Sequence, residues 1–239
     1  MHRLPVGSRM KRDFLDVALF QLEEVAYTRL RDQGFSPNGI IDVGAHNGDW
    51  IRSVRQIFPK PPALSVEARE EQRALLQSTC SELTDVEFVI ALLGPDAKSA
   101  VEFQVHGTGS SLFSERSNAA RTTRQVPMRT LDDVVASDGR LKPPIFLKLD
   151  VQGGELEVLR GGKRTLAMSE IVQIEVALLN YNEGAPLSAE VTAFMDAEGF
   201  AIYDLAGFIR PTGIDLVQID ILFARKNSAL RRDFFRFRS

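Results

Sequence analysis

The sequence predicts an α/β domain whose mostly parallel sheet is covered by helices on both faces. Short apolar runs alternate with amphipathic segments along most of the chain, which is the pattern of a doubly wound sheet. A glycine-containing turn follows the first of these runs, where such sheets bind their ligands. With 239 residues, the chain is long enough for one large domain with a substantial core.

Composition narrows the classes of protein that remain. The hydrophobic fraction of 44% and the charged fraction of 26% are typical of globular domains. A net charge of -3 gives no basic field, so we expect no nucleic-acid partner. No apolar run approaches the roughly 20 residues that span a bilayer, and no secretory signal is recognisable. With Cys80 as the single cysteine, we expect neither an intrachain disulfide nor a cysteine-based metal cluster, and a cytoplasmic location.

The chain divides into three regions. Residues 1–36 form an N-terminal helical extension, because apolar residues recur at helical spacing over 11–34 and Gly34 follows them. This helix either packs on the domain or faces a partner. Residues 37–226 form the α/β domain, and 227–239 a basic, aromatic tail that either contacts a partner or packs on the sheet.

Apolar runs bounded by glycine, proline or charged residues predict the strands. They are 40–43, 63–68, 86–93, 101–105, 125–128, 145–151, 171–178, 200–205 and 216–224. The last two are separated by a short connection, which favours antiparallel pairing. The intervening segments predict helices at 50–58, 70–80, 131–136, 155–160 and 188–198. We expect Gly161 and Gly162 to end the fourth helix and Ser188 to cap the fifth.

The turn after the first strand carries the pattern D-x-G-x-x-x-G, made of Asp42, Gly44 and Gly48. Gly44 allows a tight turn with a ligand close to the backbone, and Gly48 lies where the next helix begins. A dinucleotide site is expected to have G-x-G-x-x-G here, which is absent. A carboxylate at this turn repels a pyrophosphate but suits a sulfonium, which favours S-adenosylmethionine over NAD. A purely structural turn is the alternative.

Glu67 ends the second strand, 25 residues after Asp42 (67 − 42). An acid at this place typically accepts hydrogen bonds from the ribose hydroxyls of an adenosine cofactor. NAD and S-adenosylmethionine share that feature, so Glu67 predicts an adenosine ligand without choosing one. A solvated acid at a strand end is the alternative.

Charged residues interrupt two otherwise apolar strands. Lys148 and Asp150 share one face of the strand at 145–151, and Glu175 lies in the strand at 171–178. Asp150 and Glu175 are expected to face one pocket, as a base with its partner or as oxygen ligands of a divalent cation. The other interpretation is that Glu175 pairs with Lys148.

Several segments together resemble the FkbM family of S-adenosylmethionine-dependent methyltransferases. They are IIDVGAHNGDW, VEA, VEFVIALLG, RTLDDVV, FLKLDVQGGELEVLRGG, QIEV and VQIDILFARK. The resemblance covers roughly residues 37–226, and LKLDVQGGELEVLRGG is its most specific part. It implies a class I methyltransferase fold, Rossmann-like, with a seven-stranded sheet. It also implies methylation of a hydroxyl on a sugar, glycan or natural product.

The resemblance assigns roles to individual residues. The cofactor-binding set is Asp42, Gly44, His46, Asn47, Gly48, Glu67, Ala68, Ala91, Leu92, Ser110, Ser111 and Asp150. The residues themselves suggest the catalytic base: Asp150 is a carboxylate at the end of an apolar central strand and is our first choice, with Glu175 or His106 second. Departures from the family pattern are Gln152 for glutamate, Gly154 for alanine and His46 for asparagine. Gln152 removes one charge and so argues against a metal site that relies on that position.

Alternatives remain open at this stage. His46 either hydrogen-bonds the cofactor or the loop, which we favour, or acts as a base. A nicotinamide oxidoreductase, a methyltransferase of nitrogen or carbon, and a non-catalytic adenosine-binding protein are rival functions. We expect a small-molecule or glycan acceptor, and leave a divalent metal and a homo-oligomer open.

Overall fold

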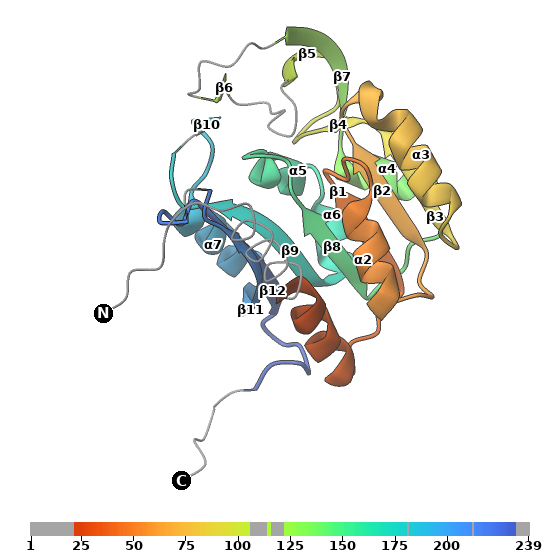
Figure 1. Cartoon of the computed structure of the whole chain (residues 1–239), viewed down its shortest axis with the longest axis vertical. Coiled ribbons are helices and arrows are strands. Elements are labelled where there is room, and N and C mark those ends of the chain that lie inside the picture. The colour runs from red at the N-terminus through yellow and green to blue at the C-terminus, as the bar shows by residue number, and fades with distance from the viewer. Residues whose placement is uncertain (1–21, 106–113, 116–121, 181, 212, 233–239) are drawn as a thin grey trace.

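A computed structural model describes residues 22–105, 114–115, 122–180, 182–211 and 213–232. Its centre is a seven-stranded sheet (Figure 1). From one edge to the other the strands are β11 (Phe200–Ile209), β12 (Gln218–Arg225), β9 (Ser169–Ala177), β8 (Ile145–Leu149), β1 (Gly39–Val43), β2 (Ala63–Glu67) and β3 (Val86–Ile90).

Strand directions match the predicted architecture. β1 pairs in parallel with β2 and β8, β2 with β3, and β8 with β9. β12 runs antiparallel to both β9 and β11. The mostly parallel seven-stranded sheet and the antiparallel closing pair are therefore confirmed. The carboxyl ends of β1, β2 and β8 consequently meet at one edge of the sheet, which is where ligands of such folds bind.

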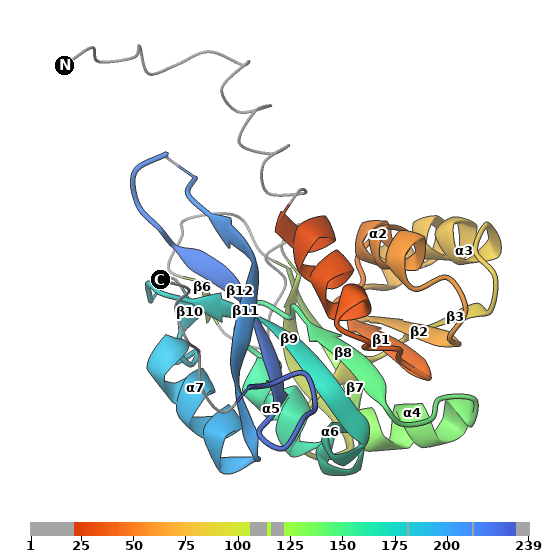
Figure 2. The same ribbon diagram turned by 90° about the horizontal axis from the view of Figure 1, so that it is seen from below.

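Helices cover both faces of the sheet, as Figure 2 shows. One face carries the helix of residues 22–32, α2 (Asp49–Ile57), the short 3-10 turn η1 (Glu70–Gln72) and α3 (Arg73–Ser81). The opposite face carries α4 (Leu131–Asp138), α5 (Glu155–Arg160), α6 (Lys163–Met168) and α7 (Ser188–Ala197). None of the helices within the described ranges is long and apolar enough to cross a membrane.

The N-terminal helix packs on the domain over residues 22–32. Ala26, Tyr27 and Leu30 are almost fully buried in the core between this helix and the sheet. Gly34, with φ of +95°, follows the helix as expected. The first half of the predicted helix, residues 11–21, lies outside the described residues.

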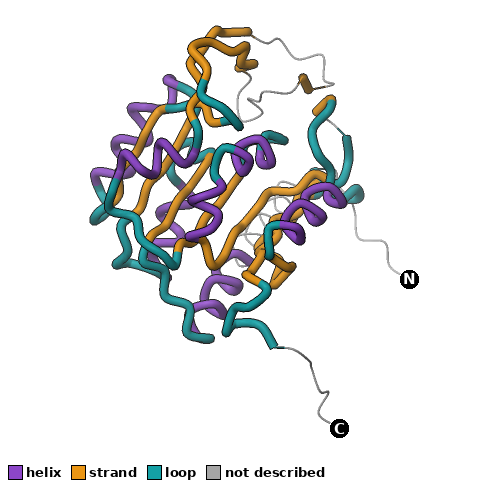
Figure 3. Tube along the Cα trace, turned by 180° about the vertical axis from the view of Figure 1, so that it is seen from behind, coloured by secondary structure: helices purple, strands orange, loops and turns teal. Residues whose placement is uncertain are grey.

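Two small sheets stand beside the main one. β4 (Leu92–Leu93) and β5 (Lys98–Val105) both pair with β7 (Thr122–Arg129), and β6 (Ser114–Glu115) pairs with β10 (Asn182–Glu183). In Figure 3 the larger of the two projects from one end of the molecule. The expectation of one strand over 86–93 is wrong, because Leu92 pairs with Met128 and so joins this second sheet.

Gly161 and Gly162 follow the end of α5 at Arg160 as expected, and Gly161 is its C-cap. A further helix, α6, begins directly after them and was not predicted. A Cβ at Gly161 would lie 2.1 Å from the carbonyl oxygen of Gly94, so this glycine permits a close backbone contact. Ser188 is not the cap of α7. The N-cap is Leu187, whose backbone N–H donates to Glu190 at 2.9 Å.

The core under the N-terminal helix predicts a large effect of Phe146→Ala. Phe146 is fully buried and contacts the rings of Tyr27, Phe35, Trp50 and Phe58 edge to face. We expect the free energy of unfolding in urea to fall by about 3–5 kcal/mol. The control Leu75→Ala, at a residue 57% exposed, should change it by less than about 0.5 kcal/mol. Equal losses in the two variants would contradict this account of the core.

Candidate active site

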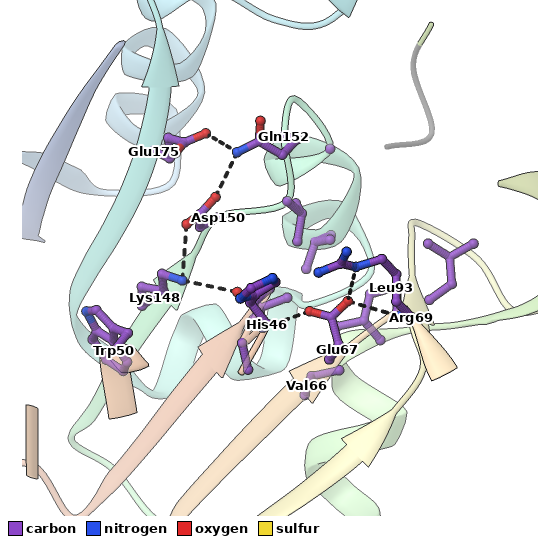
Figure 4. Close-up of a pocket in the computed structure, with 18 of the residues that line it drawn as sticks. His46, Trp50, Val66, Glu67, Arg69, Leu93, Lys148, Asp150, Gln152 and Glu175 are labelled. Carbon is purple, nitrogen blue, oxygen red and sulfur yellow. Dashed lines mark hydrogen bonds and ion pairs between the residues drawn. The ribbon is translucent and has the colours of Figure 1, made fainter. Parts of the chain in front are cut away.

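A cavity of about 500 Å³ lies at the carboxyl ends of the central strands. Its size suits a nucleoside cofactor together with part of a second substrate. The lining comes from the turns after β1, β2, β3 and β8 and from β9, β11 and β12, and Figure 4 shows its polar residues. The residues that line the cavity include Gly44, His46, Asn47, Trp50, Glu67, Ala68, Arg69, Ala91, Leu92, Phe103, Lys148, Asp150, Gln152, Glu175, Ile209 and Gln218.

The turn after β1 requires glycine at position 44. Gly44 has φ of +82°, and a Cβ there would lie only 1.8 Å from the carbonyl oxygen of Asp150. The Asp150 N–H in turn donates to the carbonyl oxygen of Val43 at 3.0 Å. The turns after β1 and β8 are therefore in direct contact, and this contact fixes the floor of the cavity.

Glu67 presents a fixed carboxylate at the end of β2. Its Oε2 accepts the backbone N–H of His46 at 2.8 Å, and its Oε1 accepts the backbone N–H and Nε of Arg69 at 2.9 and 3.2 Å. A carboxylate has about four acceptor positions, so capacity for a ligand remains. This arrangement fits a vicinal diol such as that of a ribose.

Beside Glu67, the cavity wall is apolar. Ala68, Ala91 and Leu92 line it together with Phe103 from β5. Leu92 and Phe103 are buried with Met128 in a small cluster of their own. The wall fits a flat aromatic base, and it lies one strand beyond Glu67.

Lys148 lies under the cavity with two carboxylates. Its Nζ is 3.2 Å from Asp42 Oδ1 and 3.4 Å from Asp150 Oδ2, and it donates to the carbonyl oxygen of Gly44 at 3.3 Å. Burial acts to lower the pKa of Lys148, but the two carboxylates raise it above its ordinary value, so the group is an ammonium.

Asp42 lies beneath the cavity and does not line it. Its carboxylate is completely buried, and its burial raises the pKa, with Lys148 acting in the opposite direction. This differs from the expectation of a carboxylate that faces the sulfonium. The cation that Asp42 meets is the internal ammonium of Lys148, because the side chain follows the strand alternation into the core.

Gly48 and its neighbours have separate roles. Gly48 does not line the cavity. A Cβ at this position would lie 2.6 Å from Thr79 on α3, so the glycine allows the start of α2 to pack closely against α3. His46 and Asn47 do line it. The His46 backbone N–H donates to Glu67 at 2.8 Å, while the role of its imidazole stays a prediction. The Asn47 side chain accepts from the N–H of Asp49 at 3.2 Å.

The far end of the cavity is polar. Gln152 Nε2 donates to Asp150 Oδ1 at 3.1 Å and to Glu175 Oε1 at 2.7 Å, and Figure 4 shows this chain of contacts. Gln218 from β12 donates to the other oxygen of Glu175. Glu175 thus shares the pocket with Asp150 as expected. Glu175 accepts hydrogen bonds from these two amides, and Lys148 pairs with Asp42 and Asp150.

Burial changes the ionisation of the acids around this end. Burial, together with the charges of Asp150 and Asp220, raises the pKa of Glu175 well above its ordinary value. Burial raises the pKa of Glu155 to about 7, although the backbone N–H groups of Val151 and Gly153 act to lower it. Burial and the charge of Asp150 also raise the pKa of Asp220 to about 7.

The structure brings most of the predicted site residues together at one cavity. Those that line it are Gly44, His46, Asn47, Glu67, Ala68, Ala91, Leu92, Asp150 and Glu175. Asp42 and Gly48 support it from behind. His106, Ser110 and Ser111 lie outside the described residues.

Sequence reasoning missed several lining residues. Lys148 was not assigned to the site. Its charge in an apolar strand, two residues before Asp150, was a sufficient signal to predict it as a site residue. Phe103 and Gln218 carry no such signal, because only the tertiary fold brings β5 and β12 to the cavity. Within the described ranges, no group of three or more histidine, cysteine, aspartate or glutamate side chains is arranged to hold a metal ion.

Solved structures share the fold of this chain. The magnesium protoporphyrin IX methyltransferase (ChlM) of Synechocystis PCC 6803, solved with bound SAM, aligns with a TM-score of 0.51 and 9% identity over 93% of this chain and 86% of its own. The bifunctional kinase-methyltransferase WbdD aligns with a TM-score of 0.51 and 13% identity over 90% of this chain and 41% of its own. The fold is that of class I S-adenosylmethionine-dependent methyltransferases.

The sequence places the chain within that class. The model of the methyltransferase FkbM domain matches residues 42–202, which is more than half of the chain. The chain therefore belongs to the FkbM methyltransferase family. It is an S-adenosylmethionine-dependent methyltransferase, and the nicotinamide oxidoreductase alternative loses its support. No curated protein sequence matches the chain.

The contact at Gly44 predicts that Gly44→Ala is far more damaging than Gly199→Ala. Both glycines have nearly the same backbone, with φ of +82° and +84°, but a Cβ at Gly199 meets nothing within 4 Å. Gly199→Ala should cost only about 1–2 kcal/mol for the left-handed backbone. Gly44→Ala must also displace Asp150, so we expect a loss of at least about 3 kcal/mol in urea unfolding.

The affinity for S-adenosylhomocysteine, measured by calorimetry, is the second test of the Gly44→Ala and Gly199→Ala variants. Binding should be lost in Gly44→Ala and kept in Gly199→Ala. Normal binding in the Gly44 variant would show that the turn tolerates a side chain.

The raised pKa of Asp220 predicts a pH-dependent effect of Asp220→Asn. Between the ordinary value of 3.8 and about 7, the folded protein keeps a proton that the unfolded chain has released. Stability contributed by this group is therefore present below about pH 4 and is lost as the pH rises to about 7. At pH 8, Asp220→Asn should raise Tm by about 2–4 °C or more. This is the shift that about 1 kcal/mol of added unfolding free energy gives in a domain of this size.

Scanning calorimetry at pH 4 and pH 8 tests this sign. The gain should shrink at pH 4, because the folded aspartate is protonated there and the unfolded one, with its ordinary pKa of 3.8, is partly protonated. Asp32→Asn, at an exposed residue, should change Tm little at either pH. A lower Tm for Asp220→Asn at pH 8 would reverse the argument.

Proposed function

We propose that this methyltransferase transfers the methyl group of S-adenosylmethionine to a hydroxyl oxygen of a sugar, glycan or related natural product. The observation that carries this is the polar end of the cavity, where Asp150, Gln152, Glu175 and Gln218 gather. Carboxylates and amides are the groups that hydrogen-bond several hydroxyls at once.

The other end of the cavity fits the cofactor. Glu67 would accept hydrogen bonds from the ribose, Ala91 and Leu92 would flank the adenine, and the Gly44 turn would allow the methionine part to approach the backbone. When bound, the cofactor supplies an electrophilic methyl group on a positively charged sulfur.

Asp150 is the residue that we propose as the base. An alcohol oxygen that attacks a carbon must lose its proton as the new bond forms. The Asp150 side chain is 33% exposed and lines the cavity at its polar end. Lys148 pairs with it, which stabilises the anion, and both turns hold its backbone. Proton acceptance by Asp150 leaves Lys148 paired with Asp42.

Glu175 has a supporting place in this proposal. Gln152 and Gln218 each donate to one of its oxygens, and burial raises its pKa. Its carboxyl group is therefore already engaged by two amides. It would orient the acceptor hydroxyls next to Asp150.

The proposal predicts that Asp150→Asn lowers kcat by roughly 10²–10⁴-fold, the contribution of a positioned base. Formation of S-adenosylhomocysteine with a panel of hydroxylated acceptors measures this, with mass analysis of the product. Calorimetric binding of S-adenosylhomocysteine should survive, because the ribose and adenine contacts lie elsewhere. Glu175→Gln should raise KM for the acceptor more than it lowers kcat.

Asp96→Asn, at an exposed acid outside the cavity, is the matched control and should act as wild type. Normal turnover of Asp150→Asn would remove this residue from the chemistry. A methylated nitrogen or carbon in the product would replace the hydroxyl assignment.

A further inference from the structure

Gln152 stands between the two acids at the polar end of the cavity. Its single Nε2 atom carries two hydrogens, and the hydrogen bonds to Asp150 at 3.1 Å and Glu175 at 2.7 Å use one for each carboxylate. These acids come from different elements, since Asp150 follows β8 and Glu175 belongs to β9. The amide therefore sets the separation and the orientation of both carboxylates at once.

The backbone around Gln152 is fixed independently of its side chain. Gln152 has φ of +54°, which is uncommon for a residue with a side chain. The buried carboxylate of Glu155 accepts the N–H groups on either side, from Val151 at 2.9 Å and Gly153 at 3.1 Å. Asn182 of β10 donates to the carbonyl oxygen of Gln152 at 2.8 Å. A turn held this firmly aims the amide at the two acids and keeps it there.

The charges around the pair explain why such a donor is needed. Like charges close together disfavour ionisation, whereas hydrogen bonds to a carboxylate favour its charged form. The charged and titratable groups that face Asp150 and Glu175 are Lys148 of β8, Asp42 of β1, Asp220 of β12, Glu155 of α5 and Glu23 of the helix 22–32. Four of these five groups are acids, so Lys148 alone does not neutralise the surroundings.

We propose that Gln152 is a positioning residue for methyl transfer: its amide holds the Asp150 and Glu175 carboxylates on one donor and so fixes where Asp150 meets the acceptor hydroxyl. This rests on the proposed function, because it needs Asp150 to be the base. A glutamate in place of Gln152 would add a third carboxylate at the same point, whereas methionine keeps the shape and removes the donor.

NMR titration of the carboxyl carbons tests the bridge without any turnover. Protein labelled with ¹³C at aspartate and glutamate carboxyls is titrated, and the two signals are assigned from their loss in Asp150→Asn and Glu175→Gln. In Gln152→Met, the titration midpoints of both Asp150 and Glu175 should rise by roughly 0.5–1 pH unit. Gln152→Glu should raise them further, because a like charge replaces a donor.

Gln218→Met is the matched control. Gln218 donates to Glu175, whereas the amide that donates to Asp150 is that of Gln152, so this variant should move the Glu175 midpoint and leave that of Asp150 in place. In turnover assays, Gln152→Met should lower kcat by roughly 10- to 100-fold. The acidic limb of its pH profile should move upward by the same amount as the Asp150 midpoint, with cofactor affinity unchanged.

The outcomes separate the two proposals. An unchanged Asp150 midpoint in Gln152→Met, or an equal shift in Gln218→Met, would overturn the role of Gln152. If the midpoints shift in Gln152→Met but the wild-type protein methylates no hydroxyl, the bridge is supported and the hydroxyl-transfer assignment is overturned instead. Circular dichroism of each variant checks that the fold is intact.

Discussion

The ammonium of Lys148 lies between Asp42, which is completely buried, and Asp150, which lines the cavity. Burial of a single charge is costly, and this arrangement is tolerable because each charge has a partner and Lys148 also donates to the backbone of Gly44. The same contacts tie β1 to β8 at their carboxyl ends. The floor of the cavity, the position of Asp150 and the shape of the glycine turn therefore depend on one ion cluster.

The sequence alone predicted the fold well where local pattern decides it. The apolar runs of β1, β2, β8 and β9 are short and bounded by clear signals, and α5 has its predicted limits. Prediction was wrong where tertiary contacts decide. Leu92 leaves the main sheet to pair with Met128, and α6 follows Gly162 directly where no helix was predicted.

The site shows the same division. Gly44, Glu67 and Asp150 follow predicted strands, so the rule that ligands bind at carboxyl ends located them from sequence. Asp42 was assigned to the cofactor because sequence cannot show that Lys148 is its neighbour. Gln152 was noted only as a missing charge. That its amide bridges two acids depends on a left-handed turn and on the register of β9, neither of which a linear pattern specifies.

Trp50 is the only tryptophan of the chain, and it lines the cavity. Its indole N–H donates to the hydroxyl of Tyr27 at 2.7 Å, and the Lys148 ammonium lies 5.8 Å from its ring centroid. The emission of this indole depends on nearby charge and polarity, so the enzyme carries a built-in optical probe at its binding site. Because Tyr27 belongs to the N-terminal helix, the fluorescence of Trp50 also reports how closely that helix packs on the sheet.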